Sequence, residues 1–145
     1  MKISFDRFNP NPYQRRYHFA IAFDVNKPIA IAQNNPVKID YKAYQIGQKF
    51  NIKHYQRYPY VHAESHLVSK LLDNYNTIDP NWTICVLRIN RKGLILGSKP
   101  CCNCDKILNA VGLTQVYYST DCGNFSDSIG NLTSVAELTM PMSMV

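Results

Sequence analysis

Four side chains that could carry chemistry stand in two short motifs of this chain. His62 and Glu64 form an H-x-E triplet, and Cys101 and Cys104 form a C-x-x-C pair that follows Pro100. Imidazole and thiolate groups bind zinc tetrahedrally, and a catalytic zinc site uses three protein ligands and keeps its fourth position for water. With His62, Cys101 and Cys104 as ligands that position stays open, and Glu64 stands two residues from a ligand, where it could move protons.

Neither motif alone is specific for a catalytic zinc site. A C-x-x-C pair can be half of a structural zinc site or a redox-active dithiol. A closed structural site needs a fourth protein ligand, and none of the spare candidates has convincing ligand spacing: these are Cys85, Cys102, Cys122, His54 and His66. The two motifs together, in this order, therefore favour an open zinc site.

The order of the two motifs also carries a family resemblance. H-x-E followed downstream by P-C-x-x-C is the signature of zinc-dependent nucleobase deaminases. On these motifs the chain resembles the cytidine/deoxycytidylate deaminase superfamily, and small deaminases with a similar Ser-Lys-Pro-Cys motif, here residues 98–101, occur in phages. The resemblance spans roughly residues 17–129, but only the zinc motif is specific.

The resemblance implies a role for each residue of the zinc motif. One Zn²⁺ per chain would be held by His62, Cys101 and Cys104, and the bound ion makes water easier to deprotonate. Glu64 would take the proton of the attacking water and pass it to the ring nitrogen and then to the departing ammonia. Cys102 has no partner at this spacing and is expected to face away from the metal.

The resemblance also implies contacts to the substrate. An asparagine just after the second strand binds the substrate in this superfamily, and Asn34 matches that position better than Asn35. Either asparagine could instead be an ordinary turn residue, because Asn-Asn-Pro is good turn chemistry. The backbone around Ala63 and Ser98 is expected to clamp the exocyclic amine and the ring edge.

Three functions follow from these motifs. The first is hydrolytic deamination of cytosine to uracil in a free cytidine or deoxycytidine nucleoside or nucleotide. The alternative is a deaminase that acts on cytosine or adenine within single-stranded DNA or RNA. A third is a non-catalytic zinc-fold binding module, and the presence of Glu64 argues against it, because binding alone does not need that carboxylate.

The composition is that of one globular domain over residues 1–145. No apolar run is long enough to span a membrane, and the first residues lack the apolar core of a signal peptide. The five cysteines are an odd number, and three of them lie within residues 101–104, which suits a metal rather than a disulfide framework. We therefore expect a cytoplasmic protein, of the producing or the host cell, with no membrane partner.

The formal net charge of +6 favours anionic partners, although a solvated lysine-rich surface accounts for it as well. Basic and aromatic residues alternate from Lys38 to Arg57, a stretch interpreted as a long loop. Its basic residues are Lys38, Lys42, Lys49, Lys53 and Arg57, and its rings are Tyr41, Tyr44, Phe50 and Tyr55. Rings stack on bases and lysines neutralise phosphates, so this loop could bind nucleic acid. The rings could equally pack the loop onto the protein body.

Apolar runs and turn residues predict the order of the elements. Residues 17–23 and 29–33 are two apolar strands joined by an Asp/Asn/Pro turn, which indicates a hairpin. The pattern then alternates between helix and strand: a helix over residues 62–75, a strand over 82–89, a helix over 101–111 and a strand over 116–119. Gly112 is well placed as the C-terminal glycine of the second helix.

The C-terminal part decides the direction of the last strands. Residues 120–124 are a turn signal, and a strand over residues 125–129 follows directly, so this pair is expected to be an antiparallel hairpin. Together with the resemblance, the pattern predicts an α/β, three-layer α/β/α cytidine deaminase-like fold with a central mixed sheet of about five strands. Residues 1–16 are interpreted as an irregular arm or frayed helix and residues 130–145 as an irregular tail or short helix. The resemblance also implies a homo-oligomer.

Overall fold

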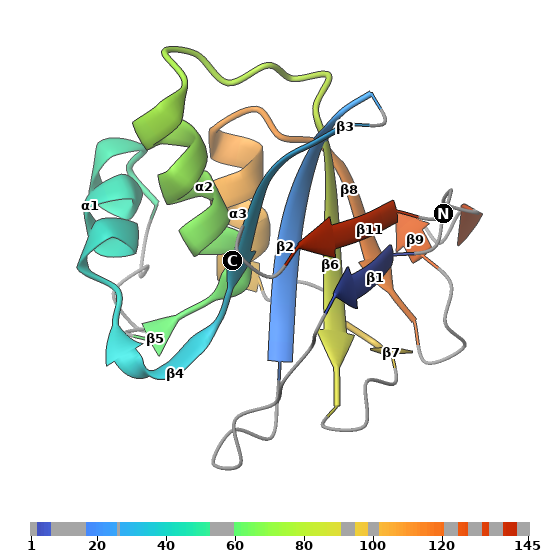
Figure 1. The fold of residues 1–145 in the computed structure, drawn as a ribbon. Helices are drawn as coiled ribbons and strands as arrows, with labels where there is room; N and C mark the ends of the chain where they lie inside the picture. Colours follow the sequence, from blue (N-terminus) through green and yellow to red (C-terminus); the bar gives the residue numbers. More distant parts are fainter. Residues whose placement is uncertain are drawn as a thin grey trace.

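The computed structural model describes residues 3–6, 17–25, 27–52, 60–90, 95–98, 102–120, 125–127, 132–133 and 138–141. Its largest sheet contains seven strands: β2 (Tyr17–Asp24), β3 (Lys27–Gln33), β6 (Thr83–Ile89), β7 (Ile95–Leu96), β8 (Gln115–Ser119), β9 (Phe125–Asp127) and β10 (Leu132–Thr133). The helices of the described part are α1 (Tyr41–Lys49), α2 (Ala63–Asn74) and α3 (Cys102–Ala110). Figure 1 shows this arrangement, which confirms an α/β fold with a mixed, open sheet.

The strand order of the sheet is β10-β9-β8-β6-β2-β3, and β7 pairs with β6. β2 and β3 form the predicted antiparallel hairpin, in which Ile21 lies opposite Ile31. β6 runs antiparallel to β2 and parallel to β8. β9 then runs antiparallel to β8, with Tyr118 opposite Ser126. The predicted direction of this C-terminal strand pair is thus confirmed.

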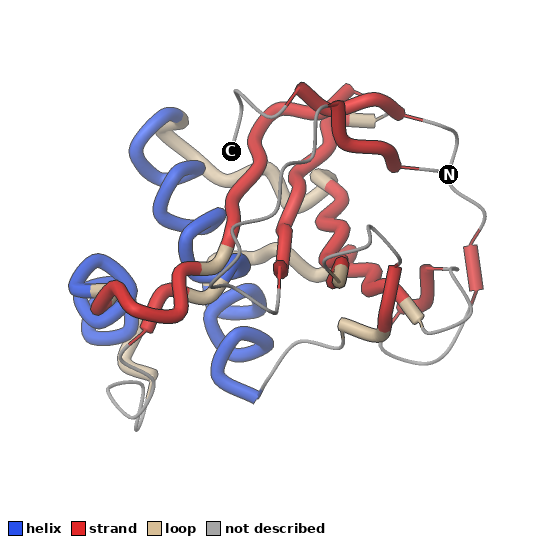
Figure 2. Tube along the Cα trace, turned by 60° about the horizontal axis from the view of Figure 1, so that its bottom comes forward, coloured by secondary structure: helices blue, strands red, loops and turns tan. Residues whose placement is uncertain are grey.

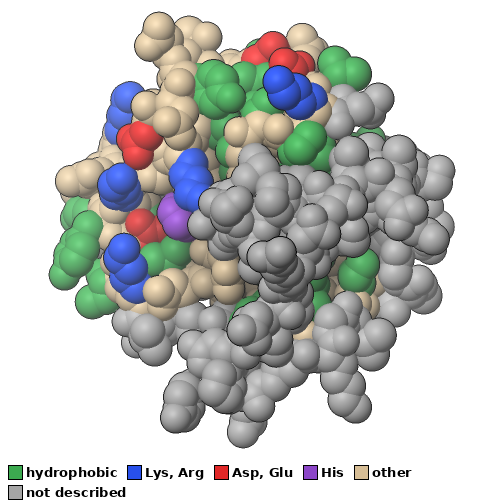
Figure 3. Space-filling view, in the orientation of Figure 1, with side chains coloured by type: hydrophobic (Ala, Val, Ile, Leu, Met, Phe, Trp, Pro, Cys, Tyr) green, Lys and Arg blue, Asp and Glu red, His purple; other side chains and the backbone are tan. Residues whose placement is uncertain are grey.

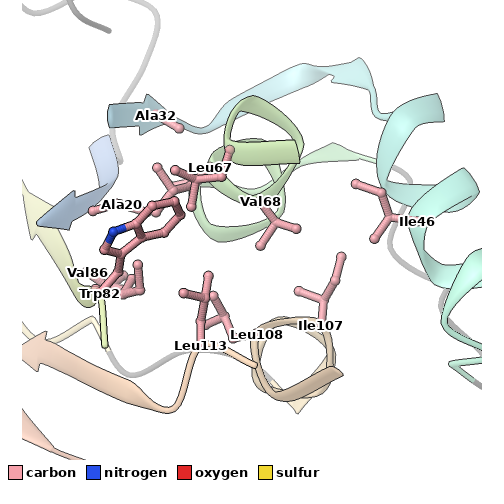
Figure 4. Packing of buried hydrophobic residues seen from close by; sticks show 14 of the residues in the cluster. Ala20, Ala32, Ile46, Leu67, Val68, Trp82, Val86, Ile107, Leu108 and Leu113 are labelled. Atoms are coloured by element: carbon pink, nitrogen blue, oxygen red, sulfur yellow. The ribbon is translucent and has the colours of Figure 1, made fainter. Parts of the chain in front are cut away.

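One face of the sheet packs against the helices. Because side chains alternate along a strand, Ala20 and Ala22 of β2 and Val86 of β6 point to the same side. They form one apolar cluster with Leu67 and Val68 of α2 and with Ile107, Leu108 and Leu113 of the α3 region. Figure 4 shows α2 in the middle of this packing, with α1 to its right and α3 below it. Small alanines on the strands let α2 approach the sheet closely, which places its first turn near the sheet.

The opposite face of the sheet is equally apolar and equally buried. Phe19 and Ile21 of β2 and Leu87 of β6 lie on that side and are fully buried. A two-stranded parallel sheet of β1 (Ile3–Asp6) and β11 (Leu138–Pro141) crosses in front of β2 and β6 in Figure 1. In the turned view of Figure 2 the helices lie together on the other side of the strands.

The β1–β11 strand pair corrects two expectations from the sequence, one about the chain ends and one about the layers of the fold. Residues 3–6 and 138–141 are strands, not parts of an irregular arm and an irregular or helical tail. The predicted α/β/α layering is also different, because in the described residues the layer opposite α2 and α3 is this strand pair and not a helix. The physical reason is that each short segment has an alternating pattern that becomes stable only when the two chain ends pair.

The stretch interpreted as a long loop is also ordered in part. β4 (Asn35–Ile39) leads into α1, and β5 (Tyr60–Val61) pairs with β4 in antiparallel fashion. α1 buries Ala43 and Ile46, and it packs on the outer side of α2. Residues 53–59, which include Lys53, Tyr55 and Arg57, lie outside the described residues.

Two helices end in the left-handed backbone conformation. Gly112 follows α3 with φ +90°, and Leu113 N–H donates to Leu108 O at 2.9 Å, which is the expected glycine cap. Asn51 follows α1 with φ 54°, and Ile52 N–H donates to Gly47 O at 2.8 Å in the same pattern. In the described part of the chain no helix is long and apolar enough to cross a membrane.

One residue in the turn between β2 and β3 has a strained backbone conformation, and a substitution can test it. Val25 has φ 58°, and its side chain is 79% exposed. A β-branched residue is disfavoured in this conformation, whereas asparagine tolerates it. We predict that Val25→Asn raises the free energy of unfolding by about 1 kcal/mol, because it relieves that strain without loss of packing. Urea denaturation measures the change, and an unchanged or lower midpoint would contradict the account.

Candidate functional site

The candidate site is built on the first turn of α2. β5 is extended up to Val61, and His62 continues that conformation as the N-cap residue, with φ −91° and ψ 147°. The His62 side chain makes no capping hydrogen bond, so the imidazole is not directed back to its own helix. Ala63, Glu64 and Ser65, the first three residues of α2, are all buried. The turn is therefore held inside the protein rather than at its surface.

The structure brings His62 and Cys104 together from two helices. The imidazole Nδ1 of His62 lies 3.4 Å from Sγ of Cys104, which is only 2% exposed. Two ligands on a tetrahedral zinc ion, with bonds of about 2.3 Å to sulfur and 2.0 Å to nitrogen, lie about 3.5 Å apart. The observed separation fits two ligands of one zinc ion, and it also suits a thiol–imidazole hydrogen bond.

The other half of the C-x-x-C pair is not described. Cys101 lies outside the described residues, so its place among the ligands stays a prediction, and the Cys102 side chain is not described either. Within the described part of the chain, no group of three His, Cys, Asp or Glu side chains gathers as a metal site. The His62–Cys104 pair is thus the part of the expected ligand set that the structure places.

Glu64 occupies the second position of α2 and is 5% exposed. The N–H groups of a helix's first turn have no partner within the helix, and the helix dipole is positive there, so a carboxylate is favoured at this end. Because Glu64 is two residues after His62, its side chain leaves the helix in a different direction from the imidazole. A buried carboxylate two residues from a candidate metal ligand can accept and release protons where bulk water has little access.

Asn34 lies close to this turn, and it also has a structural role. Its Oδ1 accepts a hydrogen bond from His18 N–H at 3.0 Å, and its own N–H donates to His18 O at 3.1 Å. These bonds extend the pairing of β2 and β3 at the end of the hairpin opposite its turn. The next residue, Asn35, pairs with Val61 directly before His62, so the two asparagines are brought near the start of α2. Contact of Asn34 with a substrate stays a prediction.

Ser98 belongs to a buried hydrogen-bond network. Its Oγ donates to Val86 O at 2.7 Å and accepts from Ser119 N–H at 3.1 Å, and its N–H donates to Ser119 O at 3.0 Å. Ser119 Oγ accepts from Arg88 N–H at 3.2 Å and lies 2.5 Å from Leu96 O. The donors of Ser98 therefore bond within the protein, where they tie the segment before Cys101 to β6 and β8.

Three other residues considered for the site, Ala63, His66 and Cys85, have surroundings that limit what they could do there. Ala63 has no exposed surface, and its side chain is in the apolar core, so only its backbone could contact a substrate. His66 Nδ1 lies 3.3 Å from Gln33 O. Burial lowers the pKa of His66, and the bond to Gln33 opposes that shift. Burial in β6 raises the pKa of the Cys85 thiol to about 12, so it is protonated at neutral pH and is a poor metal ligand.

Two positions of this region are not revealed by the sequence motifs. Ser119 is buried and bonded to Ser98, but a serine at the end of a strand carries no signal of that role. Asp40 stands in the sequence as one acid among basic residues, yet its carboxylate binds both α1 and α2. Asp40 directly precedes a helix-compatible run that begins at Tyr41, and an aspartate in that position is a usable sign of a helix N-cap.

Comparisons with protein-family models, with curated proteins and with solved structures gave no match to this chain. The functional assignment therefore depends on the residues of the site and their geometry.

The ligand assignment makes a direct prediction about zinc. The wild-type chain is expected to bind one zinc ion, and His62→Ala or Cys104→Ser is expected to weaken its affinity roughly 100-fold or more, because each removes a ligand. Competition with a chromophoric chelator measures the affinity, and mass spectrometry under native conditions gives the stoichiometry.

Cys85→Ala is the matched control for this experiment, because it removes a buried thiol outside the site. Its zinc affinity should equal that of the wild type. Wild-type affinity in Cys104→Ser, or an equal loss in Cys85→Ala, contradicts the assignment.

Proposed function

We propose that this chain is a zinc-dependent hydrolytic deaminase that converts cytosine to uracil in a free cytidine or deoxycytidine nucleoside or nucleotide. The observation that carries the proposal is the 3.4 Å contact between His62 Nδ1 and Cys104 Sγ. Glu64, two residues after His62, is buried in the first turn of the same helix. The three side chains match the roles that the H-x-E and C-x-x-C motifs predict.

His62, Cys104 and, by its sequence spacing, Cys101 would hold the zinc ion. When bound, zinc lowers the pKa of water from about 15.7 towards about 7. Glu64 accepts one proton of the attacking water and transfers it to the ring nitrogen N3, while the hydroxyl adds to C4. Glu64 then transfers the remaining hydroxyl proton to the exocyclic amine, the C4=O bond forms as the C–N bond breaks, and the amine leaves as ammonia. Burial of Glu64 keeps this proton transfer away from bulk water.

A closed structural zinc site has less support in the described residues. The Cys85 thiol lies in the core and is protonated at neutral pH, and His66 Nδ1 is directed to the carbonyl of Gln33. Neither supplies a fourth ligand beside His62. A non-catalytic zinc module also has less support, because a buried carboxylate is costly unless it has a role.

A second substrate class has one observation in its favour. Tyr41 and Tyr44 of α1 are 71% and 42% exposed, and Lys38 and Lys49 beside them are exposed as well. Figure 3 shows Lys or Arg and hydrophobic side chains together on the side of the molecule where α1 and α2 lie. Exposed rings and cations suit a single-stranded nucleic acid. Cytosine or adenine within such a strand is therefore the second candidate substrate.

Ammonia release by the zinc-loaded protein tests both candidates. Cytidine, deoxycytidine, dCMP, adenosine and a single-stranded DNA oligomer are assayed in parallel. The first candidate predicts turnover of a monomeric cytosine compound. Activity on the oligomer alone, abolished by Tyr41→Ala, establishes the second candidate instead. No ammonia from any of these substrates, with zinc bound, contradicts the proposed function.

Glu64 supplies the specific mechanistic prediction. Glu64→Gln keeps the size of the side chain but cannot accept the proton, so kcat should fall by about 10²–10⁴. Zinc content and thermal stability should stay close to those of the wild type, because the glutamine side chain would still fill the same buried volume. If Glu64→Gln turns over substrate within a few-fold of the wild-type rate, this carboxylate does not have the proposed role.

A further inference from the structure

The carboxylate of Asp40 joins two helices beside the candidate site. Its Oδ1 accepts a hydrogen bond from Ala43 N–H at 2.9 Å and thereby caps α1. Its Oδ2 accepts a hydrogen bond from Ser65 Oγ at 3.1 Å, in the first turn of α2. One side chain therefore connects the start of α1 to the turn that carries His62 and Glu64.

Ser65 has a second acceptor within reach. Its Oγ also lies 3.1 Å from the carbonyl oxygen of His62, which already accepts the N–H of His66. A serine hydroxyl has one proton to donate. A hydrogen bond to a carboxylate is stronger than one to a neutral carbonyl, so the proton is directed to Asp40. If that carboxylate oxygen is removed, the hydroxyl donates to the backbone of His62 instead.

The surrounding backbone fixes this bridge in place. β4 ends at Ile39, directly before Asp40, and β5 ends at Val61, directly before His62, and the two strands pair with Ile39 opposite Tyr60. The starts of α1 and α2 are therefore held side by side. Ser65 is buried, so the loss of its bond to Asp40 is not simply compensated by bulk solvent.

We propose that Asp40 is a positioning residue that acts through Ser65 to fix the orientation of His62 and Glu64. Asp40 does not touch the reacting atoms. Its role is to tether the first turn of α2 through the Ser65 hydroxyl and to keep that hydroxyl away from the His62 carbonyl, so that the turn keeps one geometry. The kinetic part of this inference rests on the proposed deaminase function, whereas the structural part does not.

Asp40→Asn can remove one of the two hydrogen bonds that the carboxylate accepts and keep the other. The amide oxygen can still cap α1 through Ala43, but the NH₂ group cannot accept the Ser65 proton. Lys42→Ala is the matched control, because it removes the exposed 3.1 Å ion pair to Asp73 that joins the same two helices away from the site. Hydrogen exchange at the His66 amide is expected to accelerate about tenfold in Asp40→Asn, the factor for one charge-assisted bond, and to stay unchanged in Lys42→Ala.

The kinetic readout uses whichever substrate the wild type turns over. Asp40→Asn is expected to lower kcat about tenfold, with KM changed by less than about twofold and thermal stability near that of the control. Ser65→Ala should show a similar loss, and adding Asp40→Asn to it should cause no further loss, because the two residues act as one unit. Additive losses in the double variant overturn the inference.

The failure of this inference is distinguishable from failure of the proposed function. If the wild type turns over no substrate, the proposed function fails, and His66 exchange alone decides whether Asp40 positions the turn. Unchanged exchange in Asp40→Asn, equal effects in Lys42→Ala, or faster exchange with wild-type kcat each overturn the positioning role.

Discussion

The burial of the first turn of α2 is the constraint on which the rest of the site depends. That turn must fill the core beside the sheet and also present two polar side chains. Ala63 meets the first need, because it has no exposed surface and belongs to the apolar cluster. The imidazole of His62 lies 3.4 Å from Sγ of Cys104 on α3, and Glu64 is buried in the first turn of α2. The packing that buries the first turn of α2 therefore also determines where the His62 and Glu64 side chains lie.

The rest of the fold holds that turn from three sides. The β2–β3 hairpin lies under α2, and His66 and Lys70 donate to the carbonyls of Gln33 and Ile31 in β3. α3 supplies Cys104, and the Ser98–Ser119 network anchors the segment that leads to it. α1 contributes no residue to the proposed zinc ligand set, yet its N-cap Asp40 accepts a hydrogen bond from Ser65. Local rigidity at the site thus comes from contacts between segments distant in sequence.

Sequence reasoning predicted the elements whose signals are local. The β2–β3 hairpin, the helix that carries the H-x-E motif at its start, the Gly112 cap and the antiparallel β8–β9 pair all follow from short patterns. It missed the β1–β11 pair, because neither short segment forms a strand without a partner from the other end of the chain. It also missed α1, whose buried face is narrow and includes Gly47, so that no full helical stripe is present.

For the candidate site too, the motifs predict some residues, whereas the roles of others depend on the fold. The motifs predicted His62 and Cys104 as ligands of one zinc ion; the structure places their side chains 3.4 Å apart, and zinc binding stays a prediction. The roles of Ser98, Ser119 and Asp40 depend on which backbone groups surround them, and residue type alone does not reveal that. A serine that donates to a strand carbonyl and a serine that binds substrate have the same sequence signature.

X-ray absorption spectroscopy of the zinc-loaded protein tests the central claim most directly. The account predicts two sulfur ligands at about 2.3 Å and two lighter ligands at about 2.0 Å, one of them an imidazole. Replacing Cys104 by serine should remove one sulfur from that shell. A shell of three or four sulfurs, or one with no sulfur, would contradict a centre made by His62, Cys101 and Cys104.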